Sequence, residues 1–214
     1  MPLASKHTLN LDAADPSDAE AIGNLFFAGF HDHPYFRKMM PDTSQARKCW
    51  TDHIIYCLQD PYTIVLKVTD SDVNKIVSMG LWLKPKKEED RHQPGYEEGR
   101  IKYTNDFMAC CDEETATALF GAFEKNREDF MNDRPHYSEA YKGQGAGSLI
   151  LQHGCELADK DKLECYIDSS PRGKRVYEKF GFVFTKHVPL PMHYKYHFGV
   201  RRPQTDADES SSQA

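Results

Sequence analysis

Three glycines at alternate positions, directly before an apolar run of helical period, constrain the fold of this chain more than any other feature. The backbone N–H groups at the start of such a helix have no partner within it, and the positive end of the helix dipole attracts anions. Without β-carbons in the way, a phosphate can approach these N–H groups closely. The sequence therefore predicts a phosphate-binding turn followed by a helix to about Lys160, and the turn consists of Lys142, Gly143, Gln144, Gly145, Ala146, Gly147 and Ser148.

Two other phosphate-binding motifs do not fit this glycine turn. A P-loop needs a lysine followed by Ser or Thr after its last glycine, whereas Gly147 is followed by Ser148 and Leu149. A dinucleotide fingerprint needs a small residue three positions after Gly145, which Ser148 supplies imperfectly, and it belongs early in a chain. A flexible turn that binds no ligand stays open as the simpler alternative.

Periodicity, capping residues and turn residues predict alternating helices and strands along the rest of the chain. Gly181 is expected just beyond a helix, where a left-handed backbone favours glycine. The expected strands are Thr8–Leu11, Tyr62–Thr69 and Lys75–Lys84 as a hairpin, Leu163–Asp168, Phe182–His187 and His193–Val200; the expected helices start after Asp15, at Thr43 or Ser44, near Asp112, at the glycine turn and after Ser170.

Composition favours a single domain that lies in the cytoplasm. The 214 residues are 39% hydrophobic, and no apolar run is long enough for a signal peptide or a membrane span. The six cysteines lack the spacing of a zinc site or of a disulfide framework, so we expect free thiols and no metal. A net charge of −6 argues against a nucleic-acid partner and suits a small neutral or cationic substrate.

Two motifs in the second half of the chain resemble those of the GNAT superfamily of N-acetyltransferases. Lys142–Ser148 looks like its Q/R-x-x-G-x-G/A signature, with Lys142 in the basic position and Gly145 and Gly147 in the glycine positions. Tyr177–Phe182 is similar to the family's Tyr-Glu-Lys-x-Gly-Phe. Upstream segments resemble filamentous-fungal members, namely His33–Phe36, Pro41–Thr43, Trp82–Pro85 and Arg134–His136.

This resemblance implies an α/β (α+β) fold over residues 6–200, with a mostly antiparallel, splayed sheet flanked by helices. Composition alone predicts a disordered acidic tail over 201–214, which is mostly Gln, Asp, Glu and Ser with little that could be buried. The resemblance also implies acetyl-CoA as co-substrate, with its pyrophosphate on the glycine turn. Tyr177 matches the family tyrosine that protonates the departing thiolate, although it could equally be a core aromatic residue. Ser170 and Lys174 would contact the cofactor or serve only as a helix cap and a solvated residue, and His31 and His33 would line the substrate entrance or only end a helix.

The fourth strand of this family is the part of the pattern that is hardest to find. Residues Asp133–Lys142 are few and polar, so we expect this strand to be truncated, the sheet to be interrupted, and the preceding helix to run almost directly into the glycine turn. The family often carries its acidic base in this region. Glu139 is the nearest substitute, and a base acting through water is the alternative.

Three functions remain open from the sequence. The first is an N-acetyltransferase that acts on a small-molecule amine as a monomer or homodimer. The second is a degenerate acetyl-CoA-binding domain that lost turnover with its fourth strand. The third is a structural α/β domain in which the glycine turn is a coincidence.

Overall fold

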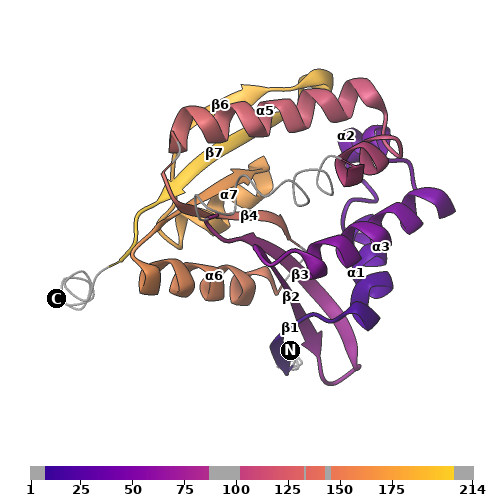
Figure 1. Ribbon diagram of the computed structural model, residues 1–214, viewed down its shortest axis with the longest axis horizontal. Coiled ribbons are helices and arrows are strands. Elements are labelled where there is room, and N and C mark those ends of the chain that lie inside the picture. The colour runs from indigo at the N-terminus through magenta and orange to yellow at the C-terminus, as the bar shows by residue number, and fades with distance from the viewer. Residues whose placement is uncertain (1–7, 87–101, 133, 143–145, 205–214) are drawn as a thin grey trace, which may run out of the picture.

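The computed structural model describes residues 8–86, 102–132, 134–142 and 146–204, and for residues 139–142 it describes the backbone alone. One sheet with helices on both faces makes up this part of the chain (Figure 1). Residues 102–108 are helical. The other elements are β1 Leu9–Ala13, η1 Pro16–Asp18, α1 Ala19–Gly29, α2 Pro34–Met39, α3 Ser44–Gln59, β2 Thr63–Asp70, β3 Lys75–Leu83, α5 Glu113–Met131, β4 His136–Lys142, α6 Gly147–Asp161, β5 Glu164–Ser169, α7 Pro171–Glu178, β6 Val183–Pro189, η3 Pro191–His193 and β7 Lys195–Arg201.

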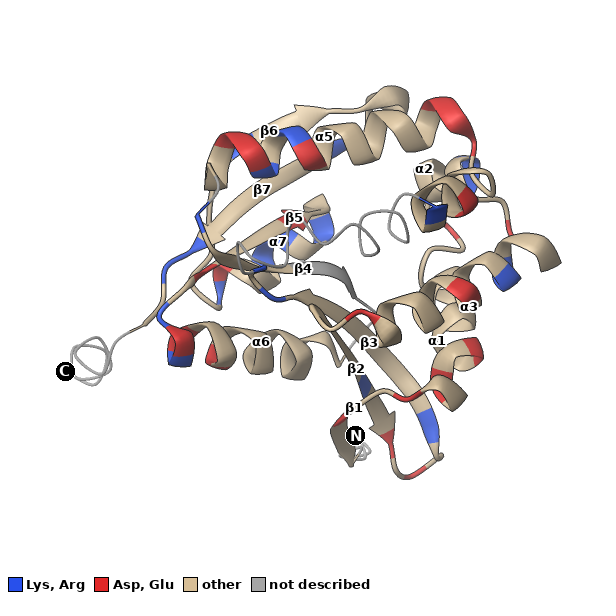
Figure 2. Cartoon of the chain, viewed as in Figure 1, with Lys and Arg blue, Asp and Glu red and all other residues tan. Residues whose placement is uncertain are grey.

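Side-chain caps fix where most of the helices begin, as the sequence predicts. Thr43 Oγ1 accepts a hydrogen bond from Ala46 N at 3.1 Å, and Asp112 Oδ1 accepts one from Thr115 N at 3.0 Å. Such caps satisfy backbone donors that have no partner inside the helix. The first turn of α5, which follows the Asp112 cap, also carries acidic residues (Figure 2), and these interact favourably with the helix dipole.

Two apolar cores lie on opposite faces of the sheet because successive strand residues point to opposite sides. On β3, Leu81 belongs to the core under α1, α3 and α5, and its neighbour Trp82 belongs to the core under α6. The helical period of the apolar residues in α6 predicts that Leu149, Ile150, His153 and Leu157 face inward. Ile150 is buried, whereas Leu149, His153 and Leu157 are only half-buried at the edge of the buried face. The buried residues of α6 are Ile150, Leu151, Gly154, Cys155 and Ala158.

Helix α6 approaches the sheet closely at one glycine. A β-carbon added to Gly154 would lie 1.9 Å from Cε2 of Trp82, so only glycine fits. The Trp82 indole Nε1 also donates a hydrogen bond to the Ile150 carbonyl at 3.2 Å. Together these contacts fix the position of α6, and with it the helix start that follows the glycine turn.

The predicted interruption of the sheet is wrong. The seven strands form one sheet in the order β1-β2-β3-β4-β5-β7-β6, with β4 antiparallel to β3 and parallel to β5. Backbone groups make the pairing, so a polar sequence does not prevent it, and seven residues is an ordinary strand length. Tyr137 and Ser138 are buried, and the Tyr137 hydroxyl donates to Asp161 Oδ2 of α6 at 2.7 Å. Helix α5 therefore connects to the glycine turn through a complete strand.

The splay that the resemblance implies is visible in the strand register. Strands β4 and β5 pair from His136 opposite Glu164 to Glu139 opposite Ile167. Beyond these residues β4 continues against β3 as far as Lys142, and β5 continues against β7 as far as Ser169. Since the two strands are parallel, their carboxyl ends part at the same edge and open a crevice there, the usual place for a ligand in such sheets.

Candidate active site

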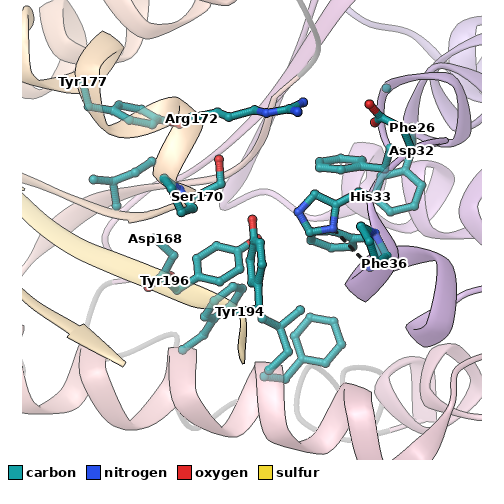
Figure 3. A pocket seen from close by; sticks show the side chains of 18 of the residues that line it. Phe26, Asp32, His33, Phe36, Asp168, Ser170, Arg172, Tyr177, Tyr194 and Tyr196 are labelled. Carbon is teal, nitrogen blue, oxygen red and sulfur yellow. Dashed lines mark hydrogen bonds between the residues drawn. The ribbon is translucent and has the colours of Figure 1, made fainter. Parts of the chain in front are cut away.

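A cavity of about 420 Å³ lies where β5 parts from β4, and Ile167 and Asp168 of β5 line it. Figure 3 shows Asp168, Ser170, Arg172 and Tyr177 on one wall and residues of α1 and α2 on the other, among them Phe26, His33 and Phe36. Tyr194 and Tyr196 lie between these two walls (Figure 3). The cavity is thus mostly apolar, with a few polar groups from the ends of β5 and α7, an arrangement typical of small-molecule sites.

The structure describes only part of the glycine turn, at its two ends. Gly143, Gln144 and Gly145 lie outside the described residues, and so does the side chain of Lys142, whose backbone pairs opposite Gly80. Helix α6 starts after Ala146 without a capping side chain, unlike α2, α3, α5 and α7. A β-carbon at Gly147 would meet nothing within 4 Å. The start of α6 thus has no capping side chain and there is room at Gly147, and phosphate binding by its first N–H groups stays a prediction.

Asp168, at the carboxyl end of β5, is a residue of the cavity that the sequence did not predict. Its carboxylate lines the cavity at the end of β5 and accepts a hydrogen bond from Tyr166 Oη to Oδ1 at 2.9 Å. Burial raises the pKa of Asp168 to about 7, against the smaller opposing effects of the Tyr166 hydrogen bond and the Arg127 charge. A carboxyl group with this pKa can accept a proton near neutral pH.

Tyr177 is both a core residue and a cavity residue. Its ring is 2% exposed and packs edge-on against Phe182, with the ring centroids 5.5 Å apart. The same side chain lines the 420 Å³ cavity. The chain turns sharply after α7 at Gly181, whose φ of +86° favours glycine as predicted. The two interpretations of Tyr177 are thus compatible, and its role as proton donor stays a prediction.

Ser170 and Lys174 lie on α7 in different surroundings. Ser170 Oγ accepts a hydrogen bond from Gly173 N at 3.2 Å and thereby caps α7, while the residue also lines the cavity. The Lys174 ammonium lies 3.4 Å from Glu178 and above the Phe184 ring. A role of either residue in cofactor binding stays a prediction.

The two histidines of the α1–α2 connection also lie in different surroundings, because only one of them lines the cavity. His33 lines the cavity, accepts a hydrogen bond from Phe36 N at 3.4 Å as the cap of α2, and stacks edge-on against Tyr194. Burial lowers the pKa of His33, which favours the neutral imidazole. His31 is exposed, with Nδ1 at 3.0 Å from the Ala28 carbonyl.

The predicted base Glu139 cannot be placed, because its side chain lies outside the described part of the structure. Its backbone pairs opposite Trp82 and Ile167 at the last paired position before the crevice. Glu139 as the base stays a prediction. Among the described residues, no group of three or more His, Cys, Asp or Glu side chains is arranged to hold a metal ion. None of the described helices combines the length and hydrophobicity that crossing a membrane requires.

Residues 89–189 match the model of the acetyltransferase (GNAT) domain. The structure resembles one described as histone acetyltransferase HPA2 and related acetyltransferase from Corynebacterium glutamicum, with a TM-score of 0.60 and 18% identity over 92% of this chain and 98% of that one. It also resembles a ribosomal-protein-S5-alanine acetyltransferase from Vibrio fischeri (TM-score 0.54, 11% identity, 94% and 96% coverage) and the spermidine/spermine N-acetyltransferase SpeG from Vibrio cholerae (0.52, 12%, 94% and 98%). A search of curated protein sequences found no match. At these identities the structural likeness establishes the fold alone, and this chain has the GNAT fold, as predicted.

Proposed function

We propose that this protein transfers an acetyl group from acetyl-CoA to the amine of a small molecule. The observation that carries the proposal is the crevice between β4 and β5, where one cavity contacts both Asp168 and Tyr177. An uncapped helix start follows β4 at the same edge of the sheet. A base and an acid on one cavity, with a helix start that can bind an anion at the same edge of the sheet, are the parts that acyl transfer from a phosphate-bearing thioester needs.

The residues present fit acetyl-CoA. The open space at Gly147 and the N–H groups at the start of α6 suit its pyrophosphate, with Lys142 as a predicted additional charge. When bound, acetyl-CoA supplies an acetyl group already activated as a thioester. The crevice between β4 and β5 would take its extended arm.

Asp168 and Tyr177 have complementary tasks in this proposal. The Asp168 carboxylate accepts a proton from the protonated amine, which makes the nitrogen lone pair available for attack on the acetyl carbonyl. The Tyr177 hydroxyl donates a proton to the sulfur as the carbon–sulfur bond breaks. The nitrogen gives its second proton to the Tyr177 phenolate as the amide forms, CoA leaves as the thiol, and Asp168 releases its proton to solvent.

Calorimetric titration with acetyl-CoA and CoA, followed by turnover on a panel of amines, tests this function. Binding with turnover supports it. Binding without turnover on any amine would favour a binding domain, although the interrupted strand that suggested this alternative is not present. Failure to bind either form of the cofactor would contradict the proposal altogether.

The glycine turn allows a direct test of cofactor binding. Gly147→Val should weaken acetyl-CoA binding by about tenfold or more, because the branched side chain would fill the space in which the phosphate meets the N–H groups. Titration calorimetry measures the effect. Gly121→Val on α5 is the matched control, since a β-carbon there also meets nothing within 4 Å. Unchanged affinity in a folded Gly147→Val protein would disprove the cofactor site.

The role of Tyr177 is tested by removing only its hydroxyl group. Tyr177→Phe keeps the ring packing against Phe182, so the free energy of unfolding should change by only about 1 kcal/mol. Turnover should fall by about a hundredfold, the usual effect of losing a proton donor. Steady-state kinetics and urea unfolding measure the two effects. Equal turnover in both proteins would leave Tyr177 with a packing role alone.

A further inference from the structure

A second cavity, of about 320 Å³, lies between α5, the helical segment 102–108 and the sheet. Asp168, Phe120 and Phe123 line this cavity and the first one. The carboxylate that we propose as the base is therefore at the junction of the two cavities. An amine held at Asp168 has the thioester crevice on one side and the second cavity on the other.

Arg127 of α5 is the cationic group of the second cavity. The Arg127 side chain is half-buried. Its charge acts on Asp168, where it opposes the larger effect of burial on the pKa. Figure 2 shows acidic and basic residues alternating along the carboxyl-terminal half of α5. Glu124 also lines the cavity but is exposed, so Arg127 is the cation that the partly enclosed space offers to a ligand, together with the Asp168 carboxyl group.

The remaining lining of the second cavity is largely aromatic. Tyr103, Phe107, Phe123 and Tyr166 contribute rings to it. Aromatic walls favour an apolar or aromatic ligand body, and a guanidinium favours a planar carboxylate that it can bind through two parallel hydrogen bonds. A polyamine would instead bring a second positive charge toward Arg127, which is unfavourable.

We propose that Arg127 binds a carboxylate of the acceptor, so that the acceptor is an amine with a carboxylate and an apolar side chain, as in an aromatic amino acid. This inference rests on the proposed acetyl transfer, with the amino group at Asp168 and the rest of the acceptor in the second cavity. Arg127 is then a specificity-determining residue, and the acetylated product would be an N-acetyl amino acid.

A binding experiment tests the carboxylate site without requiring turnover. The CoA-saturated protein is titrated with N-acetyl-L-phenylalanine and with N-acetylphenethylamine, two ligands that differ by the carboxylate. We expect the carboxylate ligand to bind about tenfold tighter or more, and Arg127→Gln to abolish this preference without weakening the neutral ligand. Arg127→Lys should keep part of the preference.

Lys125→Gln is the control, because Lys125 is an exposed cation of the same helix that does not line the cavity. Equal binding of the two ligands by the unmodified protein, no binding of either, or an equal loss of preference in Lys125→Gln and Arg127→Gln would overturn the inference.

Turnover with L-phenylalanine and phenethylamine separates this inference from the function on which it rests. A kcat/KM that is equal or higher for phenethylamine would overturn the carboxylate site and leave acetyl transfer intact. If neither amine nor any other is acetylated, while carboxylate binding still depends on Arg127, the carboxylate site stands and the proposed transfer fails.

Discussion

Asp168→Asn should reduce turnover by about a hundredfold to ten-thousandfold, the range expected when a general base is lost. The amide keeps the shape of the side chain, and the Tyr166 hydroxyl can still donate to its oxygen. In the unmodified protein, kcat/KM should rise with pH up to about 7, the pKa of the buried Asp168 carboxyl, because only the ionised form accepts a proton. The variant should lose this dependence.

The same substitution should stabilise the fold above neutral pH. Burial raises the pKa of Asp168 from 3.8 to about 7. Between these values the folded protein holds a proton that the unfolded chain has released, so stability falls as the pH rises through this range. At pH 8 the ionised carboxylate costs up to about 4 kcal/mol, and Asp168→Asn removes that cost.

Two measurements therefore decide the role of Asp168, namely turnover across pH and thermal unfolding at pH 8. The matched control is Asp32→Asn, which removes an exposed carboxylate from the wall of the same cavity. It should change neither quantity strongly. Full activity in Asp168→Asn would transfer the role of base to another group, with Glu139 the first candidate.

Gly154→Ala should destabilise the protein by about 3 kcal/mol or more, the upper part of the range for overpacked cores. The added β-carbon would overlap the indole of Trp82, which is fully buried and held by its hydrogen bond to the Ile150 carbonyl. Neither the ring nor the helix backbone can move away without breaking other contacts. Any displacement of α6 would also shift its first N–H groups, so acetyl-CoA affinity should fall as well.

Urea unfolding with a titration of acetyl-CoA measures both effects of Gly154→Ala. Gly121→Ala is the control for the helix propensity of alanine, because Gly121 is exposed inside α5 and a β-carbon there meets nothing within 4 Å. Its stability should be equal to or about 1 kcal/mol above that of the unmodified protein, with unchanged acetyl-CoA affinity. A Gly154→Ala protein of unchanged stability would mean that α6 packs less tightly on β3 than its position here requires.

Local signals in the sequence predicted most of the fold. The caps at Thr43, Asp112 and Ser170 and the glycine at Gly181 act within a few residues of themselves, so they can be recognised without the rest of the structure. The hairpin of β2 and β3 has the same local character. Strand β4 lacks such a signal, because its neighbours in the sheet are distant in sequence. Its polar residue Ser138 is buried only once the sheet is assembled.

The candidate site was predicted only in part for a similar reason. The glycine turn and Tyr177 belong to motifs that are contiguous in sequence. Asp168 belongs to no motif, and its raised pKa depends on burial that only the assembled fold creates. Asp168 lies at the carboxyl end of a strand that runs parallel to its neighbour, which is a common position for site residues. This position can be recognised only once the pairing of β4 with β5 is known.

In the sequence, helix α5 lies between β3 and β4, two strands that are neighbours in the sheet. It contributes Phe120, Phe123 and Arg127 to the cavity walls, whereas the proposed base and acid come from β5 and α7. Changes along one surface of α5 can therefore alter which amine is accepted without altering how the acetyl group moves. For enzyme engineering, a small library of substitutions in this helix is the natural place to change the acceptor of this scaffold.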